Sequence, residues 1–491
     1  MGSRSPHLAL WRRDQLQRMD EAALRDQPEL MEVAGAALAR SIRAETLTRV
    51  ELWIGPGNNG GDGLVAAKHL LETGHEVSLW MPMGLPKASD SLTAWQRLGI
   101  GHDLKIDHPL QGDQPRIIVD CLFGTGLRRA LSGDVAMAAD ATHHLRWPVI
   151  ACDVPSGLDA DTGQVLGPTV RATKTVTFGG YKVGFFGDVA TAHHGDIEWV
   201  GLGFTDAHRR AAGPPMAWVV EGLPPLPPQP AGGGSKVSQG RVLALVGSPG
   251  MEGAAMLALS GLELGGAGLV HLLIPEVERH LLPGVAEEVM VAADETQALA
   301  ALKRSHCGVA GCGLGRSGDR LLTLKRFLSQ GQNLPWVLDA DALWHLAETP
   351  DLGLPDTCLL TPHEGEALRL LDDPSITGRV QVAQALQARF GCWVLLKGPG
   401  NVLAGPDECR VFPGHQRALA RAGSGDLLAG MIAAFLGRGM AMTDAVELAI
   451  YLQMKGAQNL HSGEEEVVGQ RELKVEFAKV WRQLKDADRS S

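Results

Sequence analysis

The chain has 491 residues, of which 45% are hydrophobic and 21% are charged, as is typical of a globular protein, and its formal net charge is -11. At roughly 150 residues per domain, this length predicts two or three domains. The acidic balance argues against a surface for nucleic acid or anionic membranes, and the few aromatic residues argue against base stacking.

The start of the chain has no apolar run of signal-peptide length, and no segment reaches about 20 uninterrupted apolar residues. Seven scattered cysteines, none in a C-x-x-C pair, predict reduced thiols, with neither a disulfide framework nor a zinc site. We therefore expect a cytoplasmic protein, forming a homo-oligomer, with no nucleic-acid or membrane partner.

The first half of the chain contains five short apolar runs that predict strands. They are VELWIG (50–55), HEVSLWM (75–81), RIIVDCLFG (116–124), WPVIACDVPSG (147–157) and TKTVTFGG (173–180). Runs that are apolar throughout are typical of parallel strands covered on both faces. Their alternation with helical patterns predicts an α/β fold, in which ligands bind at the carboxyl ends of the strands.

The first run leads into GPGNNGGDG (55–63), and LVAAKHLLETG (64–74) predicts the helix that follows. The glycines fit G-x-G-x-x-G, and a glycine turn between strand and helix suits a phosphate. As a nicotinamide fingerprint the stretch is incomplete, because Glu76 begins the next strand where an acidic residue should end it. No GK[ST] follows, so it is not a Walker loop. A tight turn without a ligand is the alternative.

Polar residues gather at three successive strand ends in this half. They are Asn58, Asn59, Asp62, Asp120, Asp153 and Ser156. A carboxylate at an apolar strand end is costly unless it is paired or bound to a cation. Because every member offers oxygen and none is His or Cys, the set suits a hard cation.

These stretches, with ELMEVAG (29–35), DCLFGTGL (120–127) and DVPSGLD (153–159), resemble the NAD(P)H-hydrate epimerase family over roughly residues 10–205. The resemblance implies a Rossmann-like domain whose substrate is a nicotinamide nucleotide hydrated at ring carbon C6. It implies that a potassium ion is held by Asn59, Asp120 and Ser156. It also implies that the hydrate is lined by Asn58, Asn59, Gly60, Gly61, Asp62, Gly124, Thr125, Gly126, Leu127, Arg128, Arg129, Ala130 and Asp153.

Epimerisation at C6 requires water to leave and return on the opposite face, or an equivalent ring opening. Both routes need a proton donor and a proton acceptor at the hydroxyl group. Asp120 and Asp153 are the available titrating groups, and the sequence does not divide the acid and base roles between them.

The segment GPPMAWVVEGLPPLPPQPAGGGS (213–235) differs in composition from its surroundings. Clustered proline followed by glycine and serine is typical of extended, unpacked backbone. We therefore expect a linker at 213–235 between an N-terminal domain, 1–212, and a C-terminal domain, 236–491.

The second half repeats the pattern of strands, glycine-rich turns and helices. Its predicted strands are GRVLALVGS (240–248), GLVHLLIP (268–275), CGVAGCG (307–313), LPWVLDAD (334–341), CLLTPHE (358–364) and CWVLLKG (392–398). In ARAGSGDLLAGMIAAFLGRG (420–439), Gly423, Ser424 and Gly425 precede a helix whose free N–H groups suit an anion, and Asp426 falls in its first turn. An N-cap aspartate is the plainer interpretation.

A glycine-rich loop before a helix that starts with Asp is typical of ribokinase-like enzymes, in which the Asp takes a proton from the substrate hydroxyl. More specifically, GSPGMEGAA (247–255), GCGLG (311–315), DADAL (339–343), TPHEGE (361–366), KGPGN (397–401) and GSGD (423–426) resemble the ADP-dependent NAD(P)H-hydrate dehydratase family over about 236–485. The resemblance implies ADP, with Mg²⁺, as phosphoryl donor. It implies hydrate contacts from Ala255, Gly315, His363 and Asp426, and nucleotide contacts from Lys397, Gly398, Pro399, Gly400, Asn401 and Gly425. The sequence departs from the family just before GSGD, at Gln416, Arg417, Arg421 and Ala422, so the preference for ADP or ATP stays open.

Together the two resemblances imply a bifunctional enzyme that repairs NADH hydrate and NADPH hydrate. We expect the N-terminal domain to interconvert the R and S epimers. We expect the C-terminal domain to dehydrate the S epimer, with Asp426 as base, and to release NAD(P)H, AMP and phosphate. A ribokinase-like small-molecule kinase fused to a nucleotide-binding domain is the alternative enzyme, and a nucleotide-sensing regulator is the non-enzymatic alternative.

Overall fold

The computed structural model describes residues 8–99, 102–228, 239–273, 289–414, 419, 421–460 and 470–488. The chain forms two compact units, Met1–Val219 and Val220–Ser491, whose boundary falls inside the segment predicted to be a linker. Part of that segment is packed, because β10 (Ala217–Val219) pairs antiparallel with β1 (Ala9–Trp11). The N-terminal unit therefore extends into 213–235.

The N-terminal unit is built on a seven-stranded sheet of order β4-β3-β2-β5-β6-β7-β9, in which every neighbouring pair is parallel. The strands are β2 (Arg49–Ile54), β3 (Glu76–Trp80), β4 (Lys105–Ile106), β5 (Ile117–Cys121), β6 (Val149–Cys152), β7 (Lys174–Phe178) and β9 (Asp196–Val200). All five predicted strands are confirmed, and β4 and β9 lie at the two edges.

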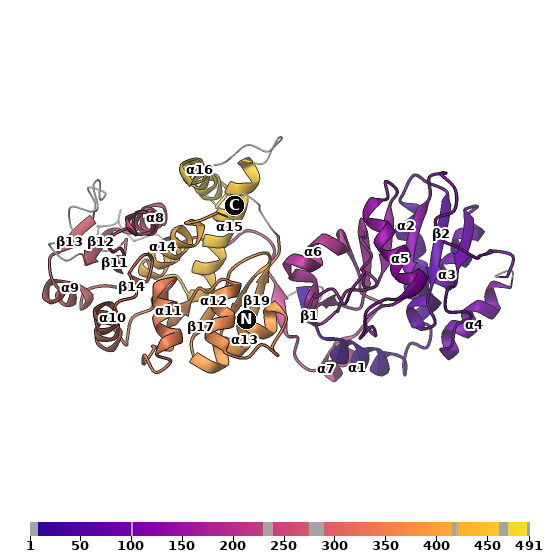
Figure 1. Cartoon of the computed structure of the whole chain (residues 1–491), viewed down its shortest axis with the longest axis horizontal. Coiled ribbons are helices and arrows are strands. Elements are labelled where there is room, and N and C mark those ends of the chain that lie inside the picture. Colours follow the sequence, from indigo (N-terminus) through magenta and orange to yellow (C-terminus); the bar gives the residue numbers. More distant parts are fainter. Residues whose placement is uncertain are drawn as a thin grey trace. The chain divides into compact units, whose positions relative to one another are not determined.

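Helices cover both faces of this sheet (Figure 1). The apolar residues of α2 (Leu30–Arg43), α3 (Asn58–Glu72) and α4 (Ser89–Leu98) form one core with one face of the strands, and those of α5 (Gly133–Ala141) form a second core with the other. The remaining elements are α1 (Arg13–Ala23), β8 (Tyr181–Lys182), α6 (Asp188–His194) and α7 (Asp206–Ala212). The α/β class is confirmed.

The glycine stretch at 55–63 is mostly helical, which differs from the predicted loop. Helix α3 begins at Asn58, six residues before the predicted start at Leu64, and its N-cap is Gly57. A Cβ on Gly60 would lie 2.1 Å from the carbonyl oxygen of Gly55, and one on Gly63 would lie 2.7 Å from Cys121 Sγ. These glycines therefore let the helix lie directly against the ends of β2 and β5.

The C-terminal unit contains the strand order β13-β12-β11-β14-β15-β16-β17-β18-β19. The strands are β11 (Arg241–Leu245), β12 (Leu269–Leu273), β13 (Val289–Ala292), β14 (Cys307–Ala310), β15 (Trp336–Leu338), β16 (Cys358–Leu360), β17 (Trp393–Leu396), β18 (Asn401–Ala404) and β19 (Cys409–Phe412). Pairs from β13 to β17 are parallel, whereas β18 and β19 add an antiparallel meander. The six predicted strands are confirmed, and sequence reasoning missed β13 and the meander.

Two groups of helices enclose this sheet (Figure 1). One face is covered by α8 (Glu252–Leu264), α14 (Ser424–Gly437), α15 (Met442–Leu460) and α16 (Gln470–Asp488), whose apolar residues share one core with the strands. The helices α9 (Glu295–Leu302), α10 (Gly318–Gln330), α11 (Asp341–Glu348), α12 (Glu364–Leu371) and α13 (Arg379–Phe390) cover the other. Among the described helices, none combines the length and the apolar character needed to cross a membrane.

Candidate active sites

The N-terminal unit has a cavity of about 490 Å³ at the carboxyl ends of β2, β5 and β6. The predicted site residues that line it are Asn58, Asn59, Asp62, Gly124, Thr125, Gly126, Leu127 and Asp153. Gly60 and Gly61 are buried within α3, and Arg128, Arg129 and Ala130 are exposed beyond the lining. The structure therefore brings together three of the strand ends that the sequence singled out.

Asp120 and Ser156 lie buried behind this lining and are bonded to each other. The Ser156 N–H donates to Asp120 Oδ2 at 2.7 Å, and Ser156 Oγ donates to Asp120 Oδ1 at 2.7 Å. Burial raises the pKa of Asp120 to about 6, although the hydrogen bonds that it accepts from Ser156 and Leu122 act in the opposite direction. With 0% of its surface exposed, Asp120 does not reach the cavity directly.

Asn59 and Asp153 converge on Gly124. A Cβ at Gly124 would lie 3.1 Å from Asn59 Oδ1 and 3.3 Å from Asp153 Oδ2, so a side chain at this position would crowd both oxygens. Asn59 Nδ2 is buried and has no hydrogen-bond partner among the described residues. Oxygen donors gathered in this way fit a hard cation such as potassium.

Asp153 has an unusual backbone conformation and is ion-paired with a buried lysine. It has φ of 64°, which is uncommon for a residue other than glycine. Its Oδ1 is ion-paired with Lys182 Nζ, which is 1% exposed and also donates to Thr177 Oγ1 and to the Phe178 carbonyl at 2.9 Å. Sequence reasoning assigned Lys182 no role, because a lysine two residues after a glycine pair shows no pattern of its own.

Asp20, on α1, also lines this cavity and was missed. The only signal in the sequence is its position between Leu16 and Leu24 at intervals of four, which places a carboxylate inside an apolar helix stripe.

The C-terminal unit has a cavity of about 550 Å³ at the carboxyl ends of β15, β16 and β17 and the start of α14. The predicted residues that line it are His363, Lys397, Gly398, Pro399, Asn401, Gly425 and Asp426. Gly400 is buried next to this loop, whereas Ala255 lies in the core and Gly315 lies outside the lining. Two of the four predicted hydrate contacts, His363 and Asp426, thus face one cavity.

Asp426 is the third residue of α14, and the N-cap is Gly423 with φ of 92°. The plainer interpretation of Asp426 as an N-cap is therefore wrong. Burial raises the pKa of Asp426 to about 6, and Asp339 adds to the shift, whereas the Cys312 thiol and Lys397 oppose it. Such a carboxylate is suited to act as a base near neutral pH.

Lys397 and Asp339 form an ion pair beneath the first turn of α14. Lys397 Nζ lies 2.6 Å from Asp339 Oδ1, and a Cβ on Gly425 would lie 2.9 Å from the same ammonium. Ala340, beside Asp339, has φ of 47° and ψ of -114° and lines the cavity. The free N–H groups of α14 and the Lys397 ammonium therefore favour an anion at the same place.

His363 both lines the cavity and caps α12. Its Nδ1 accepts hydrogen bonds from the N–H groups of Gly365, at 3.0 Å, and Glu366, at 3.3 Å, while Glu366 Oε2 accepts from the His363 N–H at 2.9 Å. This capping box fixes the ring in place.

Two supporting residues were missed because they act on loops that are distant in sequence. Arg379 donates to the carbonyl groups of Lys397 at 2.9 Å and Gly400 at 3.2 Å, and so holds the 397–401 loop. Asp341 accepts from the Gly315 N–H at 2.9 Å. Of the departures before GSGD, Arg421 and Ala422 line the cavity, whereas Gln416 and Arg417 lie outside the described residues.

Comparisons with known proteins identify both halves. Residues 27–184 match the family described as YjeF-related protein N-terminus, and residues 242–474 match the family described as NAD(P)H-hydrate dehydratase. The bifunctional NAD(P)H-hydrate repair enzyme of Moorella thermoacetica is 33% identical over 469 residues, covering 86% of each chain. That of Thermanaerovibrio acidaminovorans is 34% identical over 532 residues, covering 96% of this chain and 98% of the relative.

Among solved structures, the ADP/ATP-dependent NAD(P)H-hydrate dehydratase from Bacillus subtilis, co-crystallized with ATP/Mg²⁺, is 27% identical. The match has a TM-score of 0.46 and covers 53% of this chain and 94% of that one. The coverage of the bifunctional relatives extends over both units of this chain. The chain therefore belongs to the family of bifunctional NAD(P)H-hydrate repair enzymes.

Proposed function

We propose that this chain repairs hydrated nicotinamide nucleotides in two steps. The N-terminal half epimerises the R and S forms of NADH hydrate and NADPH hydrate. The C-terminal half dehydrates the S form at the expense of ADP and yields NAD(P)H, AMP and phosphate. The observation that carries the proposal is the position of Asp426, which shares a cavity with Lys397 at the start of α14.

In the dehydratase site, the Asp426 carboxylate takes the proton of the C6 hydroxyl. The hydroxyl oxygen then attacks the terminal phosphorus of ADP, and AMP leaves. Loss of a C5 proton and departure of phosphate from C6 restore the ring double bond. Hydroxide is a poor leaving group and phosphate a good one, so the nucleotide serves to change the leaving group.

The N–H groups at the start of α14, which include that of Gly425, and the Lys397–Asn401 loop would hold the nucleotide phosphates. Mg²⁺ would enter with those phosphates, as it usually does in phosphoryl-transfer sites. Ala255 and Gly315 stay proposals as hydrate contacts, with Gly315 held towards the site by Asp341.

In the epimerase site, Asn59, Asp120 and Ser156 would hold potassium, whose charge would orient the hydrate's oxygen atoms. Asp153, which does line the cavity, is placed to contact the substrate directly. Asp120 is buried, so we propose that it acts on the substrate through its bonds to Ser156 and the ion. The residues of 58–62 and 124–130 would line the nucleotide.

The domain assignment follows the same division. We propose that 1–212 and 236–491 contain the two activities and that 213–235 connects them. All seven cysteines are free and buried, which fits a reducing cytoplasm. A homo-oligomer stays a prediction, which sedimentation would test.

The function is tested by adding ADP to a mixture of the R and S epimers of NADH hydrate and following the return of reduced-nicotinamide absorbance. Full return supports both steps, and return of only the S fraction contradicts epimerisation. A phosphorylated product that accumulates would indicate a small-molecule kinase instead. Repeating the assay with choline in place of potassium tests the ion, because only epimerisation should then fail.

A further inference from the structure

Helix α1 places a single carboxylate on the wall of the N-terminal cavity. Leu16, Asp20 and Leu24 follow one another at intervals of four, so they share one side of the helix, and all three line the cavity. The Asp20 side chain makes no hydrogen bond among the described residues. The Asp20 carboxylate is exposed to water and so needs no protein partner, and its position on the cavity wall leaves it free to meet a ligand.

The groups that face Asp20 favour its protonated form. Asp20 is open to the water in the cavity, but protein atoms crowd around it, and this crowding raises its pKa to about 7. Asp153 and its helix neighbour Glu21 raise it further, and Lys182 lowers it. A carboxyl group with such a pKa can both give and take a proton near neutral pH.

Asp90, in the first turn of α4, also lines the cavity, and three further carboxylates of the site are less suited to carry a proton to a substrate. Asp153 is bound by Lys182, and Asp120 is buried away from the cavity. Burial raises the pKa of Asp62 well above the usual range, and the Asp153 and Asp20 carboxylates add to the shift, which disfavours release of its proton.

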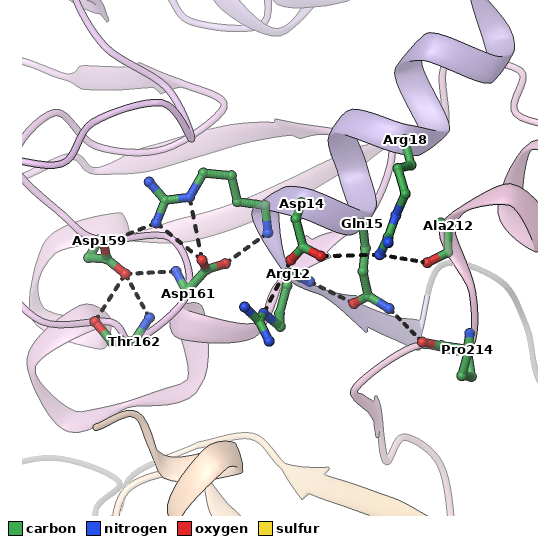
Figure 2. Close-up of polar contacts among 10 residues, drawn as sticks. Arg12, Asp14, Gln15, Arg18, Asp159, Asp161, Thr162, Ala212 and Pro214 are labelled. Atoms are coloured by element: carbon green, nitrogen blue, oxygen red, sulfur yellow. Dashed lines mark hydrogen bonds and ion pairs between the residues drawn. The ribbon is translucent and has the colours of Figure 1, made fainter. Parts of the chain in front are cut away.

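The helix is tied to the loops of the same site. Arg13 donates to the Leu127 carbonyl at 3.0 Å and forms ion pairs with Asp159 at 3.2 Å and Asp161 at 3.1 Å. Asp159 in turn accepts from the N–H and the hydroxyl of Thr162, as Figure 2 shows. Asp20 is thus held in a fixed relation to the substrate loops.

We propose that Asp20 is the acid that protonates the departing C6 hydroxyl during epimerisation, an inference that rests on the epimerase function proposed above. Asp20 gives its proton to the hydroxyl oxygen, the electrons of the C6–O bond leave with water, and the lone pair of ring nitrogen N1 forms a C6=N1 bond. Water then adds to the opposite face of C6 and gives its extra proton to the water in the cavity, from which the Asp20 carboxylate recovers a proton. The transient positive charge lies beside the Asp153 carboxylate.

The test follows conversion of the purified R epimer to the S epimer by chromatography, without ADP, so that only the epimerase site acts. Asp20→Asn should lower the enzymatic rate by about 100-fold or more. Asp14→Asn, which removes the same charge from the exposed side of the same helix, should leave the rate unchanged. Dehydration of the S epimer with ADP, measured on the same samples, should be equal in all variants and corrects for the concentration of the chain. Thermal melting of the same variants reports whether the N-terminal unit is folded.

The pH dependence separates an acid from a residue with a structural role. The wild-type rate should fall as pH rises above about 7, as the acid form of Asp20 is lost, and Asp20→Glu should keep this fall. A flat wild-type profile, or Asp20→Asn within three-fold of wild type, overturns the role of Asp20 and leaves the function standing. A wild-type chain that does not epimerise at all overturns the function itself. If Asp20→Asn fails to fold, the wild-type and Asp20→Glu profiles decide.

Discussion

In the proposed mechanism, the dehydration step depends on Asp426. Asp426→Asn keeps the size of the side chain but cannot take a proton, so turnover of the S epimer with ADP should fall by on the order of 10²–10⁴. Wild-type turnover should rise with pH through about 6, where Asp426 ionises. Because the folded state raises this pKa, it holds the proton more tightly than the unfolded chain does, and ionisation costs stability as pH rises. The variant should therefore melt no lower than wild type at pH 8.

Asp444→Asn is the matched control, because Asp444 lies in the first turn of the next helix, α15. Removing a favourable charge from the first turn of a helix lowers the free energy of unfolding by about 0.3–1 kcal/mol. Turnover should stay unchanged. Turnover of Asp426→Asn within a few-fold of wild type would leave Asp426 a structural residue.

Site residues that belong to a sequence motif could be predicted. Site residues that stand outside any motif and reach the site only in the folded chain could not. Asp426 was found because a glycine-rich turn before a helix determines where its side chain lies. Lys182 and Arg379 act on carboxylates and carbonyls that the fold brings near them, and neither stands in a pattern. The sequence shows Asp20 only as a charged residue between Leu16 and Leu24, and this pattern could not be interpreted before the cavity was known.

At the scale of the element, the position of α1 depends on Arg13, whose side chain is 8% exposed. Arg13→Gln removes the ion pairs of Arg13 with Asp159 and Asp161, and breaking a buried pair costs about 3–5 kcal/mol. We expect lower stability and slower epimerisation with normal dehydration, measured by thermal melting and the two assays. Arg18→Gln, which breaks an exposed pair with Asp14, should cost no more than about 1 kcal/mol. Equal losses of stability from Arg13→Gln and Arg18→Gln would contradict the role of Arg13 in positioning α1.

Helix α3 offers a second test at this scale. Glycine to alanine inside a helix usually stabilises by about 1 kcal/mol. Gly60→Ala should do the reverse, because its Cβ would meet the Gly55 carbonyl oxygen. Gly253→Ala in α8, where nothing lies within 4 Å of the new Cβ, should be neutral or stabilising. Chemical denaturation of both variants measures the difference, and a stabilised Gly60→Ala would contradict the close packing.

Element types were predictable from their apolar runs, whereas element limits and edges were not. A parallel strand buried on both faces reads as an unbroken apolar run, and all eleven such runs form strands. The start of α3 was misplaced because glycine disfavours helices locally, and tight packing against β2 outweighs that preference. Strands as short as β1 and β10, with three residues each, leave no clear pattern in the sequence.

For the whole molecule, the two units should fold and act separately. Fragment 1–220 should be more stable than fragment 1–212, because the shorter one loses β10 and the Pro214 carbonyl to which Gln15 Nε2 donates. Likewise, 220–491 should be more stable than 236–491, because the Val220 N–H donates to the Val411 carbonyl at 2.8 Å. Melting and the separate activities of the four fragments check this. If no fragment is active while the full chain is, the units do not act independently.

The division into two α/β units could be predicted because proline and glycine gather in one segment. Its exact limits could not, since a strand as short as β10 is favoured by its partner β1 and not by its own composition.

The contact between Gly60 and Gly55 has a consequence for how such chains are recognised. The two residues fit the glycine pattern used to search for dinucleotide-binding proteins. In this fold, however, the backbone of Gly60 packs directly against the backbone of Gly55. A pattern search would select this chain and would name a ligand class that agrees with its family. That agreement would be accidental, because the matched glycines allow a helix to pack closely against the end of a strand.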